Sequence, residues 1–219
     1  MSAVAVILAR GGSKGLPRKN LRKLLGETLL ARAIRTCQQS DACDVVVSTE
    51  DNEIAREARR TGARVVDRPP YLAADEADSW DGVRHAIQAA ALSGPLALVQ
   101  CTAPMLTPGD VDGTLAAAQA GEMAVCVQRC HHLLLDGGGR PVNWAIDTPR
   151  RQEQPPQCRL AGSVWAMEAE YCLNSALYSG RVRLHEAEHP HQIDIDTEDD
   201  WKLAEHLSCT TSSYHRSTS

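Results

Sequence analysis

The sequence predicts an α/β fold with a mostly parallel sheet and helices on both of its faces. Short apolar runs alternate along the chain with segments in which apolar residues recur at helical spacing. Strands that alternate with helices form mainly parallel sheets, because each helix carries the chain back across one face to the next strand. A chain of 219 residues can bury one substantial core. We therefore expect a single Rossmann-like domain over residues 1–207 and a flexible tail at 208–219.

Each element in the first half of the chain has its own signal. Val4–Leu8 is an apolar run that ends at a glycine-containing turn, as a buried first strand does. The helix predicted at Asn52–Thr61 is followed by Gly62, the residue type that most often ends a helix. A Thr-Pro pair marks the start of a helix at Pro108–Ala120. The remaining predicted elements here are helices at Leu29–Gln39 and Ser79–Leu92, and strands at Val45–Ser48, Arg64–Asp67, Leu96–Gln100 and Met123–Gln128.

The pattern changes between Cys130 and Gln157, where glycines and prolines interrupt any long element. We expect a small excursion at 130–158 that serves as a dimerisation arm. Beyond it, the sequence predicts strands at Gly162–Met167 and Ile193–Asp196 and a last helix at Glu198–Leu207.

Composition argues against several classes of function. The formal net charge is −5, which disfavours a general nucleic-acid-binding surface. No apolar run reaches the length of a membrane span, and the start of the chain lacks the features of a signal peptide. The 8 cysteines are scattered without a CxxC pair, so we interpret them as reduced and mostly buried. These features favour a cytoplasmic protein that acts on small molecules.

The most informative stretch is the loop that follows the first strand, Ala9–Leu21. It combines three glycines with four cations and with two polar side chains that donate hydrogen bonds. Glycines let backbone amides approach a ligand closely, and amides together with cations bind polyphosphates. The loop matches neither the Walker A pattern nor the Rossmann dinucleotide fingerprint. A solvated basic loop is the alternative, but its place at the carboxyl end of a buried strand favours a phosphate site.

Five segments, in the same order along the chain, resemble the CMP-sialic acid synthetase (acylneuraminate cytidylyltransferase) family. The loop is the first, and Val47–Asp51 (VSTED) resembles the family's VSTDD segment. The others are Asp67–Asp75 (DRPPYLAAD), Val99–Pro104 (VQCTAP) and Gln192–Trp201 (QIDIDTEDDW). The resemblance covers residues 3–207. It implies a GT-A-like nucleotidyltransferase fold, a homodimer, and the transfer of CMP from CTP to an acidic acceptor.

The same resemblance assigns residues to the nucleotide. Arg10 and Lys19 are implied to neutralise the α-phosphate and the departing pyrophosphate, and with Asp196 they form the expected catalytic set. Arg68 matches a nucleotide-binding position, although an arginine before two prolines also fits an exposed loop. The full set of implied CTP-binding residues is Leu8, Ala9, Arg10, Gly11, Ser13, Lys14, Lys19, Asn20, Arg68 and Ser79.

Asp194 and Asp196 are the candidate metal ligands. On a strand, this i, i+2 spacing puts both carboxylates on one face. Two carboxylates directed at a phosphate substrate suit Mg²⁺, which completes its shell with water and phosphate oxygens. The alternative is an acidic cluster that stabilises the N-terminus of the last helix, a role that Asp199 and Asp200 fit well. Because Asp194 and Asp196 precede that helix, we favour magnesium.

Four further residues match acceptor-side positions of the family, namely Gln100, Arg151, Gln152 and Arg159. In this interpretation Arg151 is a bidentate clamp for a carboxylate or a phosphonate. An ordinary solvated loop cation is the alternative for Arg151.

Departures from the family pattern concern the acceptor. His131 and His132 are followed by Leu133, where the family has a lysine. Leu106 replaces an arginine, and Ala161 replaces an asparagine. We therefore expect a changed acceptor, either a small phosphonate such as phosphonoformate or a nonulosonic acid. A CMP-sialic acid synthetase proper, a 3-deoxy-manno-octulosonate cytidylyltransferase and a non-catalytic nucleotide-binding regulator stay open as alternatives.

Overall fold

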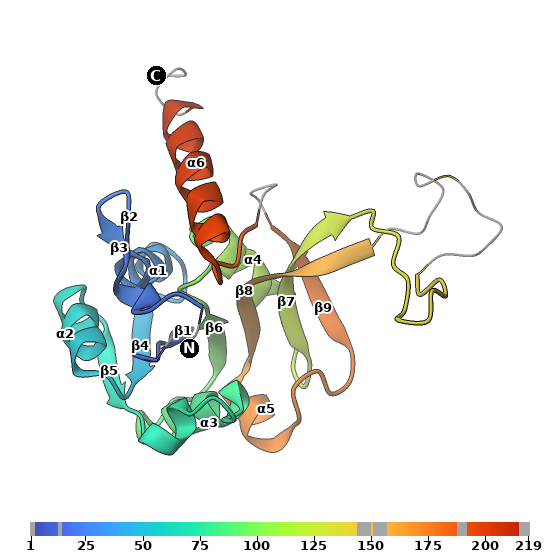
Figure 1. Cartoon of the computed structure of the whole chain (residues 1–219). Helices are drawn as coiled ribbons and strands as arrows, with labels where there is room; N and C mark the ends of the chain where they lie inside the picture. Colours follow the sequence, from blue (N-terminus) through green and yellow to red (C-terminus); the bar gives the residue numbers. More distant parts are fainter. Residues whose placement is uncertain (1–2, 13–14, 144–149, 151–156, 188–191, 215–219) are drawn as a thin grey trace.

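The computed structural model describes the chain except for residues 1–2, 13–14, 144–149, 151–156, 188–191 and 215–219. Within the described residues, seven strands form one sheet in the order β5-β4-β1-β6-β8-β7-β9 (Figure 1). These strands are β1 (Val4–Leu8), β4 (Asp44–Thr49), β5 (Arg64–Asp67), β6 (Pro95–Val99), β7 (Met123–Cys130), β8 (Gln157–Glu168) and β9 (Val182–Glu186). β1, β4, β5 and β6 are mutually parallel, β9 is parallel to β7, and β8 is antiparallel to β6 and β7. The prediction of a mostly parallel α/β sheet is confirmed.

Helices cover both faces of this sheet. One face carries α1 (Leu29–Gln38), α2 (Asn52–Arg60), α4 (Pro108–Ala117) and α6 (Glu198–Tyr214), and the other carries α3 (Ser79–Ala89) and α5 (Ala169–Asn174). β1 illustrates the division, since Ala5 and Ile7 join one core cluster while Val6 joins the other. Among the described residues, no helix is both long and apolar enough to cross a bilayer.

Side-chain caps fix the starts of the first four helices. Thr28 caps α1, Asp51 caps α2 and Asp78 caps α3, each accepting a hydrogen bond from a backbone amide of the first turn. Thr107 forms a capping box with Asp110 at the start of α4. All four predicted first residues are confirmed. The helices end one to three residues earlier than predicted.

The C-terminal part of the chain differs from the prediction. The segment Ile193–Asp196 is irregular and not a strand, and its backbone is joined to the fold by a 2.8 Å hydrogen bond from Ile195 N–H to Thr102 C=O. α6 continues past the predicted end at Leu207 to Tyr214. β9 was not predicted, because this edge strand lacks an apolar run: Arg183, His185 and Glu186 are polar, and only two of its residues are apolar.

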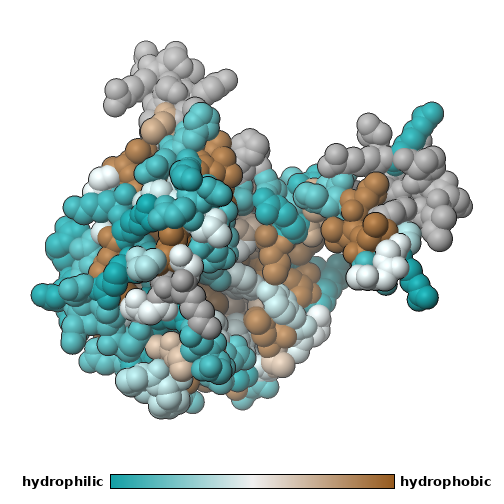
Figure 2. Space-filling view, viewed as in Figure 1, coloured by the Kyte–Doolittle hydropathy of each residue, from teal (hydrophilic) through white to brown (hydrophobic). Residues whose placement is uncertain are grey.

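β7 and β8 extend beyond the body of the sheet and carry the arm (Figure 1). Their last pair is Cys130 with Gln157, so both strands reach further than predicted and the excursion between them starts at residue 131. Four apolar side chains on the arm are exposed, and Figure 2 shows them as a hydrophobic group away from the body; they are Leu133, Leu134, Leu135 and Val142. A short hairpin, β2 (Lys23–Leu24) with β3 (Glu27–Thr28), and the 3-10 helices η1 (Lys19–Leu21) and η2 (Pro70–Ala73) complete the fold.

The cysteines are free, as expected, but only half of them are buried. Burial raises the pKa of Cys37, Cys101 and Cys172 to about 12 and that of Cys126 to about 11. Protonated thiols of this kind act as small apolar groups, because the thiolate is the reactive form.

Candidate functional site

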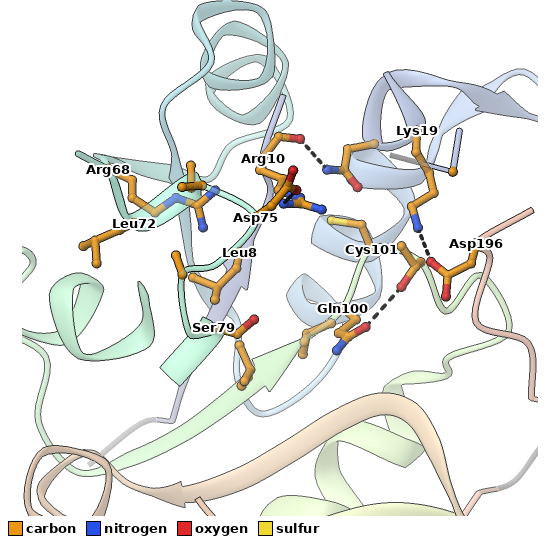
Figure 3. A pocket seen from close by; sticks show the side chains of 18 residues that line it. Leu8, Arg10, Lys19, Arg68, Leu72, Asp75, Ser79, Gln100, Cys101 and Asp196 are labelled. Carbon is orange, nitrogen blue, oxygen red and sulfur yellow. Dashed lines mark hydrogen bonds and ion pairs between the residues drawn. The ribbon is translucent and has the colours of Figure 1, made fainter. Parts of the chain in front are cut away.

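A cavity of about 470 Å³ opens beyond the carboxyl ends of β1 and β6 (Figure 3). Ligands of open α/β sheets bind at this edge, where the loops after parallel strands converge. The wall comes from the loop after β1, the segment between β5 and α3, the loop after β6 and the segment before α6. Eight predicted site residues line this cavity, namely Leu8, Arg10, Lys19, Asn20, Arg68, Ser79, Gln100 and Asp196.

Two described residues that were predicted to bind CTP, Ala9 and Gly11, are not part of this wall. Ala9 is fully buried in the core. The backbone N–H of Gly11 donates to Glu50 Oε1 at 2.7 Å, so this amide is directed away from a ligand. Ser13 and Lys14 lie outside the described residues.

The loop after β1 is fixed by contacts with neighbouring segments. Asn20 Nδ2 donates to the carbonyl oxygen of Arg10 at 3.0 Å and ties the two ends of the loop together. Arg18 adopts a left-handed backbone conformation, with φ of 56°, and its guanidinium donates to Asp51 Oδ2 at 2.5 Å. This hydrogen bond holds the pKa of Asp51 below its usual range. The turn at Arg18 leads directly into η1, which presents Lys19 and Asn20 to the cavity.

Lys19 is the cation with the most closely defined position. Its side chain is 12% exposed, and its ammonium donates to Asp196 Oδ1 at 2.8 Å and to the carbonyl oxygen of Ile195 at 2.5 Å. Arg10 also lines the cavity, and its Nη1 is paired with Asp75 Oδ1 at 2.8 Å. Both cations thus face the space where a polyphosphate would lie, and each is neutralised by a carboxylate from another segment.

Arg68 lies on the opposite side of the cavity from Lys19 and Asp196 (Figure 3). Its side chain is 4% exposed, and Nη2 donates to Glu50 Oε2 at 2.9 Å. The structure therefore makes Arg68 a buried, oriented side chain, not the exposed loop residue that the sequence left as an alternative.

Of the two candidate metal ligands only Asp196 lines the cavity, and Asp194 lies close enough for its carboxyl group to be influenced by the charge of Asp196. Asp194 lies near the Thr102 hydroxyl, and its carboxylate fits against Gly162, where an added Cβ would lie 3.0 Å from Oδ2. Partial desolvation of the carboxyl group raises the pKa of Asp194, although the residue as a whole is exposed, and the negative charge of Asp196 adds to this shift.

The donor set at Asp194 and Asp196 fits a divalent cation that takes few protein ligands. Two mutually repelling carboxylates are a place where a cation relieves repulsion. In the described part of the chain, no group of three or more His, Cys, Asp or Glu side chains has the arrangement of a metal site. Carboxylate oxygens are ligands that Mg²⁺ takes, together with waters and phosphate oxygens of its substrate.

The two predicted acceptor residues that the structure describes, Gln100 and Arg159, line different hollows. Gln100 lines the cavity, and its Oε1 accepts a hydrogen bond from Thr102 Oγ1 at 3.2 Å. Arg159 lies at the root of the arm, where it donates to the Gln128 side chain and to the Gln192 carbonyl oxygen. Arg151 and Gln152 lie outside the described residues. A separate shallow hollow around Arg159 is lined by Gln128, Arg129, Cys130, His131, His132 and Arg159.

Two positions that depart from the family pattern are core residues in this structure. Leu106 is 8% exposed and Ala161 is 4% exposed, and both belong to the core cluster that also contains Ile193 and Ile195. The apolar residues at these two positions therefore pack in the core beneath the segment that carries Asp194 and Asp196.

Several functional candidates were missed by sequence reasoning. Four residues to which the sequence pattern gives no role contact or line the site, namely Glu50, Asp75, Cys101 and Thr102. The sequence feature that could have identified them is their position in segments that follow predicted strands. Which of these side chains point toward the cavity depends on packing, and the sequence alone does not provide it.

Replacing Gly15 by alanine is expected to weaken strongly the binding of CTP, the nucleotide that the sequence resemblance implies. A Cβ on Gly15 would lie 2.2 Å from the carbonyl oxygen of Asp196, so the loop and the aspartate segment would have to separate. We expect KM for CTP to rise by about ten- to a hundredfold, from a strain of roughly 1–3 kcal/mol. Gly12→Ala is the matched control, because a Cβ there meets no atom of the described residues within 4 Å. Equal effects of the two substitutions in steady-state assays would contradict the proposed contact.

Comparison with known proteins agrees with this geometry. The sequence profile described as cytidylyltransferase matches residues 4–133. N-acylneuraminate cytidylyltransferases B and A of Danio rerio are 31% and 32% identical, each over 92% of this chain, and the chain spans about half the length of these relatives. The structure of a CMP:2-keto-3-deoxy-manno-octonic acid synthetase complexed with CTP matches with a TM-score of 0.72 and 17% identity, covering 96% of this chain and 100% of that one. The chain therefore belongs to the cytidylyltransferase family, as its resemblance to the acylneuraminate enzymes predicted.

Proposed function

We propose that this protein is a CTP-dependent cytidylyltransferase that transfers CMP to an acidic acceptor and releases pyrophosphate. One observation carries the proposal: Lys19 of the glycine-rich loop and Asp196, 177 residues further along the chain, meet at 2.8 Å at the edge of one cavity. A phosphate-binding loop opposite a candidate metal ligand is the arrangement that nucleotidyl transfer requires.

The positions of the cations suggest how CTP lies in the cavity. We place the triphosphate along Arg10 and Lys19, near Asp196, and the nucleoside toward Arg68 and Ser79 on the opposite side. Arg10 would exchange Asp75 for phosphate oxygens when the nucleotide enters, because a polyphosphate carries more negative charge than one carboxylate.

In the proposed reaction, an acceptor oxygen attacks the α-phosphorus of CTP in line with the departing pyrophosphate. Lys19 and Arg10 stabilise the negative charge on the α-phosphate and on the leaving group. A divalent cation held by Asp194 and Asp196 would supply further charge neutralisation at the phosphate oxygens. No covalent enzyme intermediate is needed.

We propose a small phosphonate, such as phosphonoformate, as the acceptor, with a nonulosonic acid as the second candidate. The cationic hollow at the root of the arm, with Arg159 beside His131 and His132, supports an anionic acceptor. The apolar residues Leu133 and Leu106 stand where the resembled family carries cations, which supports an acceptor with fewer polar groups than a nine-carbon acid.

Pyrophosphate release from CTP, measured with a panel of acids, tests both levels of the proposal. The panel contains sialic acid, related nonulosonic acids, 3-deoxy-manno-octulosonic acid and small phosphonates, each with Mg²⁺. Turnover of any acid supports a cytidylyltransferase, and strong turnover of sialic acid would exclude the small-acceptor proposal. CTP binding without turnover of any acid would instead support a nucleotide-binding regulator. The Lys19→Met protein, assayed in parallel, controls for contaminating activity.

We also propose that the protein is a cytoplasmic homodimer that associates through the arm. The exposed leucines 133–135 and Val142 form the apolar group that such an interface would bury. Free cysteines are typical of a reducing compartment. Light scattering of the purified protein measures the assembly, and the mass of a monomer would refute the dimer.

A further inference from the structure

The side chain of Glu50 joins the loops that follow three neighbouring strands. The strands β1, β4 and β5 end at the same level of the sheet, where Ala9 N–H donates to Ser48 C=O and Arg68 N–H donates to Thr49 C=O. Glu50 is the first residue after β4. It therefore lies between the loop after β1 and the loop after β5, which carry the cations of the proposed nucleotide site.

Both carboxylate oxygens of Glu50 are used, and each binds a different loop. Oε1 accepts the backbone N–H of Gly11 at 2.7 Å, and Oε2 accepts Arg68 Nη2 at 2.9 Å. The Glu50 side chain is 19% exposed and does not line the cavity, whereas Arg68 does. The contacts of Glu50 with the site therefore run through its two partners, the backbone of Gly11 and the guanidinium of Arg68.

Arg68 depends on this contact for its orientation. Its side chain is 4% exposed, and its Nε atom is buried without a hydrogen-bond partner among the described residues. A buried guanidinium with an unsatisfied donor is costly, and removing its carboxylate partner would leave the charge uncompensated. The position of Arg68 in the cavity is therefore set by Glu50.

Gly11 has a matching constraint. A Cβ at this position would lie 2.5 Å from Asp51 Oδ2, so the backbone of the loop packs directly against the segment after β4. The hydrogen bond from Gly11 N–H to Glu50 fixes the loop at that distance. The same carboxylate therefore sets the phosphate side and the nucleoside side of the cavity relative to each other.

We propose that Glu50 is a positioning residue for CTP, which holds the glycine loop and Arg68 in the binding geometry without touching the nucleotide. The proposal rests on the proposed function for the identity of the ligand. It predicts a larger effect on nucleotide binding than on the chemical step, because Lys19 and Asp196 are held by contacts that do not involve Glu50.

Steady-state kinetics of Glu50→Gln test the proposal. Glutamine can accept a hydrogen bond from Gly11 with its oxygen, but its amide nitrogen then faces Arg68, donor against donor. We expect KM for CTP to rise by about ten- to a hundredfold through the loss of a charge-assisted hydrogen bond, with kcat within about twofold. Glu50→Asp keeps the charge and is expected to recover part of the affinity. An unchanged KM for CTP would overturn the proposal.

The matched control is Asp44→Asn, at the other end of the same strand. Asp44 pairs with Arg64 at 3.0 Å on the surface, so its loss tests the effect of removing an ion pair from β4 without touching the cavity. We expect its KM and kcat to equal those of the wild type. If Asp44→Asn and Glu50→Gln raise KM equally, Glu50 has only a structural role and the proposal fails.

A double-mutant cycle with Arg68→Met separates positioning from general destabilisation. If Glu50 acts through Arg68, the Glu50→Gln change adds little once Arg68 is absent, whereas independent effects would add. Calorimetry measures the CTP affinities of the same four proteins and so completes the cycle without an activity assay. If Glu50→Gln does not fold, Glu50→Asp takes its place. Absence of turnover by the wild type with every acid would refute the proposed function. If the wild type binds CTP but the effects of Glu50→Gln and Arg68→Met add, only the proposed role of Glu50 is refuted, and the proposed function stands.

Discussion

Replacing Lys19 by methionine is expected to lower kcat/KM for CTP by about 10²- to 10³-fold, the usual effect of losing one preorganised group that stabilises transition-state charge. The ammonium is held by Asp196 and by the carbonyl oxygen of Ile195, so it does not need to reorganise when charge develops on the phosphates. Methionine keeps the length and the apolar stem of lysine but removes the charge. Pyrophosphate release at varied CTP concentrations measures the loss.

Lys23→Met is the control for this experiment. Lys23 lies four positions further along, in β2, and is exposed, so its charge contributes to the same region without facing the cavity. We expect its kinetics to match those of the wild type. A small, equal decrease in both variants would indicate that only the overall positive charge of the region matters, and the catalytic role of Lys19 would then be wrong.

Much of this site was predictable because its position follows from chain topology. The apolar periodicity of the first half predicted the parallel strands, and parallel strands place their following loops at one edge. That argument brought the loop after Leu8 to the same edge as the segment after Val99, and the cavity is found there. The helix starts were predictable for a different, local reason. Short polar side chains such as Asp51 and Asp78 cap helices by accepting hydrogen bonds from nearby backbone amides.

Other features depended on contacts that no local pattern encodes. Ile193 and Ile195 alternate with two aspartates, a pattern that is typical of a strand. In the structure the alternation has another cause, because the two isoleucines fill the core beneath the site from an irregular segment. No local pattern distinguishes Glu50 from other acidic residues before a helix, and its proposed role follows only from its contacts with Gly11 and Arg68.

Asp196→Asn is expected to lower turnover by about 10³-fold, at the upper end for a single electrostatic group. The change removes a carboxylate that faces the cavity, and with it both a proposed ligand of Mg²⁺ and the charged partner of Lys19. Asparagine is nearly the same size and still offers an oxygen, so the packing around Ile195 should be kept. Pyrophosphate release, measured across a range of MgCl₂ concentrations, should show a requirement for much more magnesium.

The control for Asp196 is chosen to separate a metal ligand from an acidic helix start. Asp199 lies in the first turn of α6, is exposed, and pairs with Lys202 at 2.8 Å, so Asp199→Asn removes the same charge from the same region. If the aspartates merely stabilise the helix dipole, both variants lose similar stability and neither loses much activity, since such effects are worth about 0.3–1 kcal/mol. If Asp196 binds a cation that also contacts the triphosphate, only Asp196→Asn changes the magnesium dependence of CTP binding in thermal-shift titrations.

A non-catalytic nucleotide-binding protein would tolerate both changes, because binding alone does not require charge to be stabilised on a departing pyrophosphate.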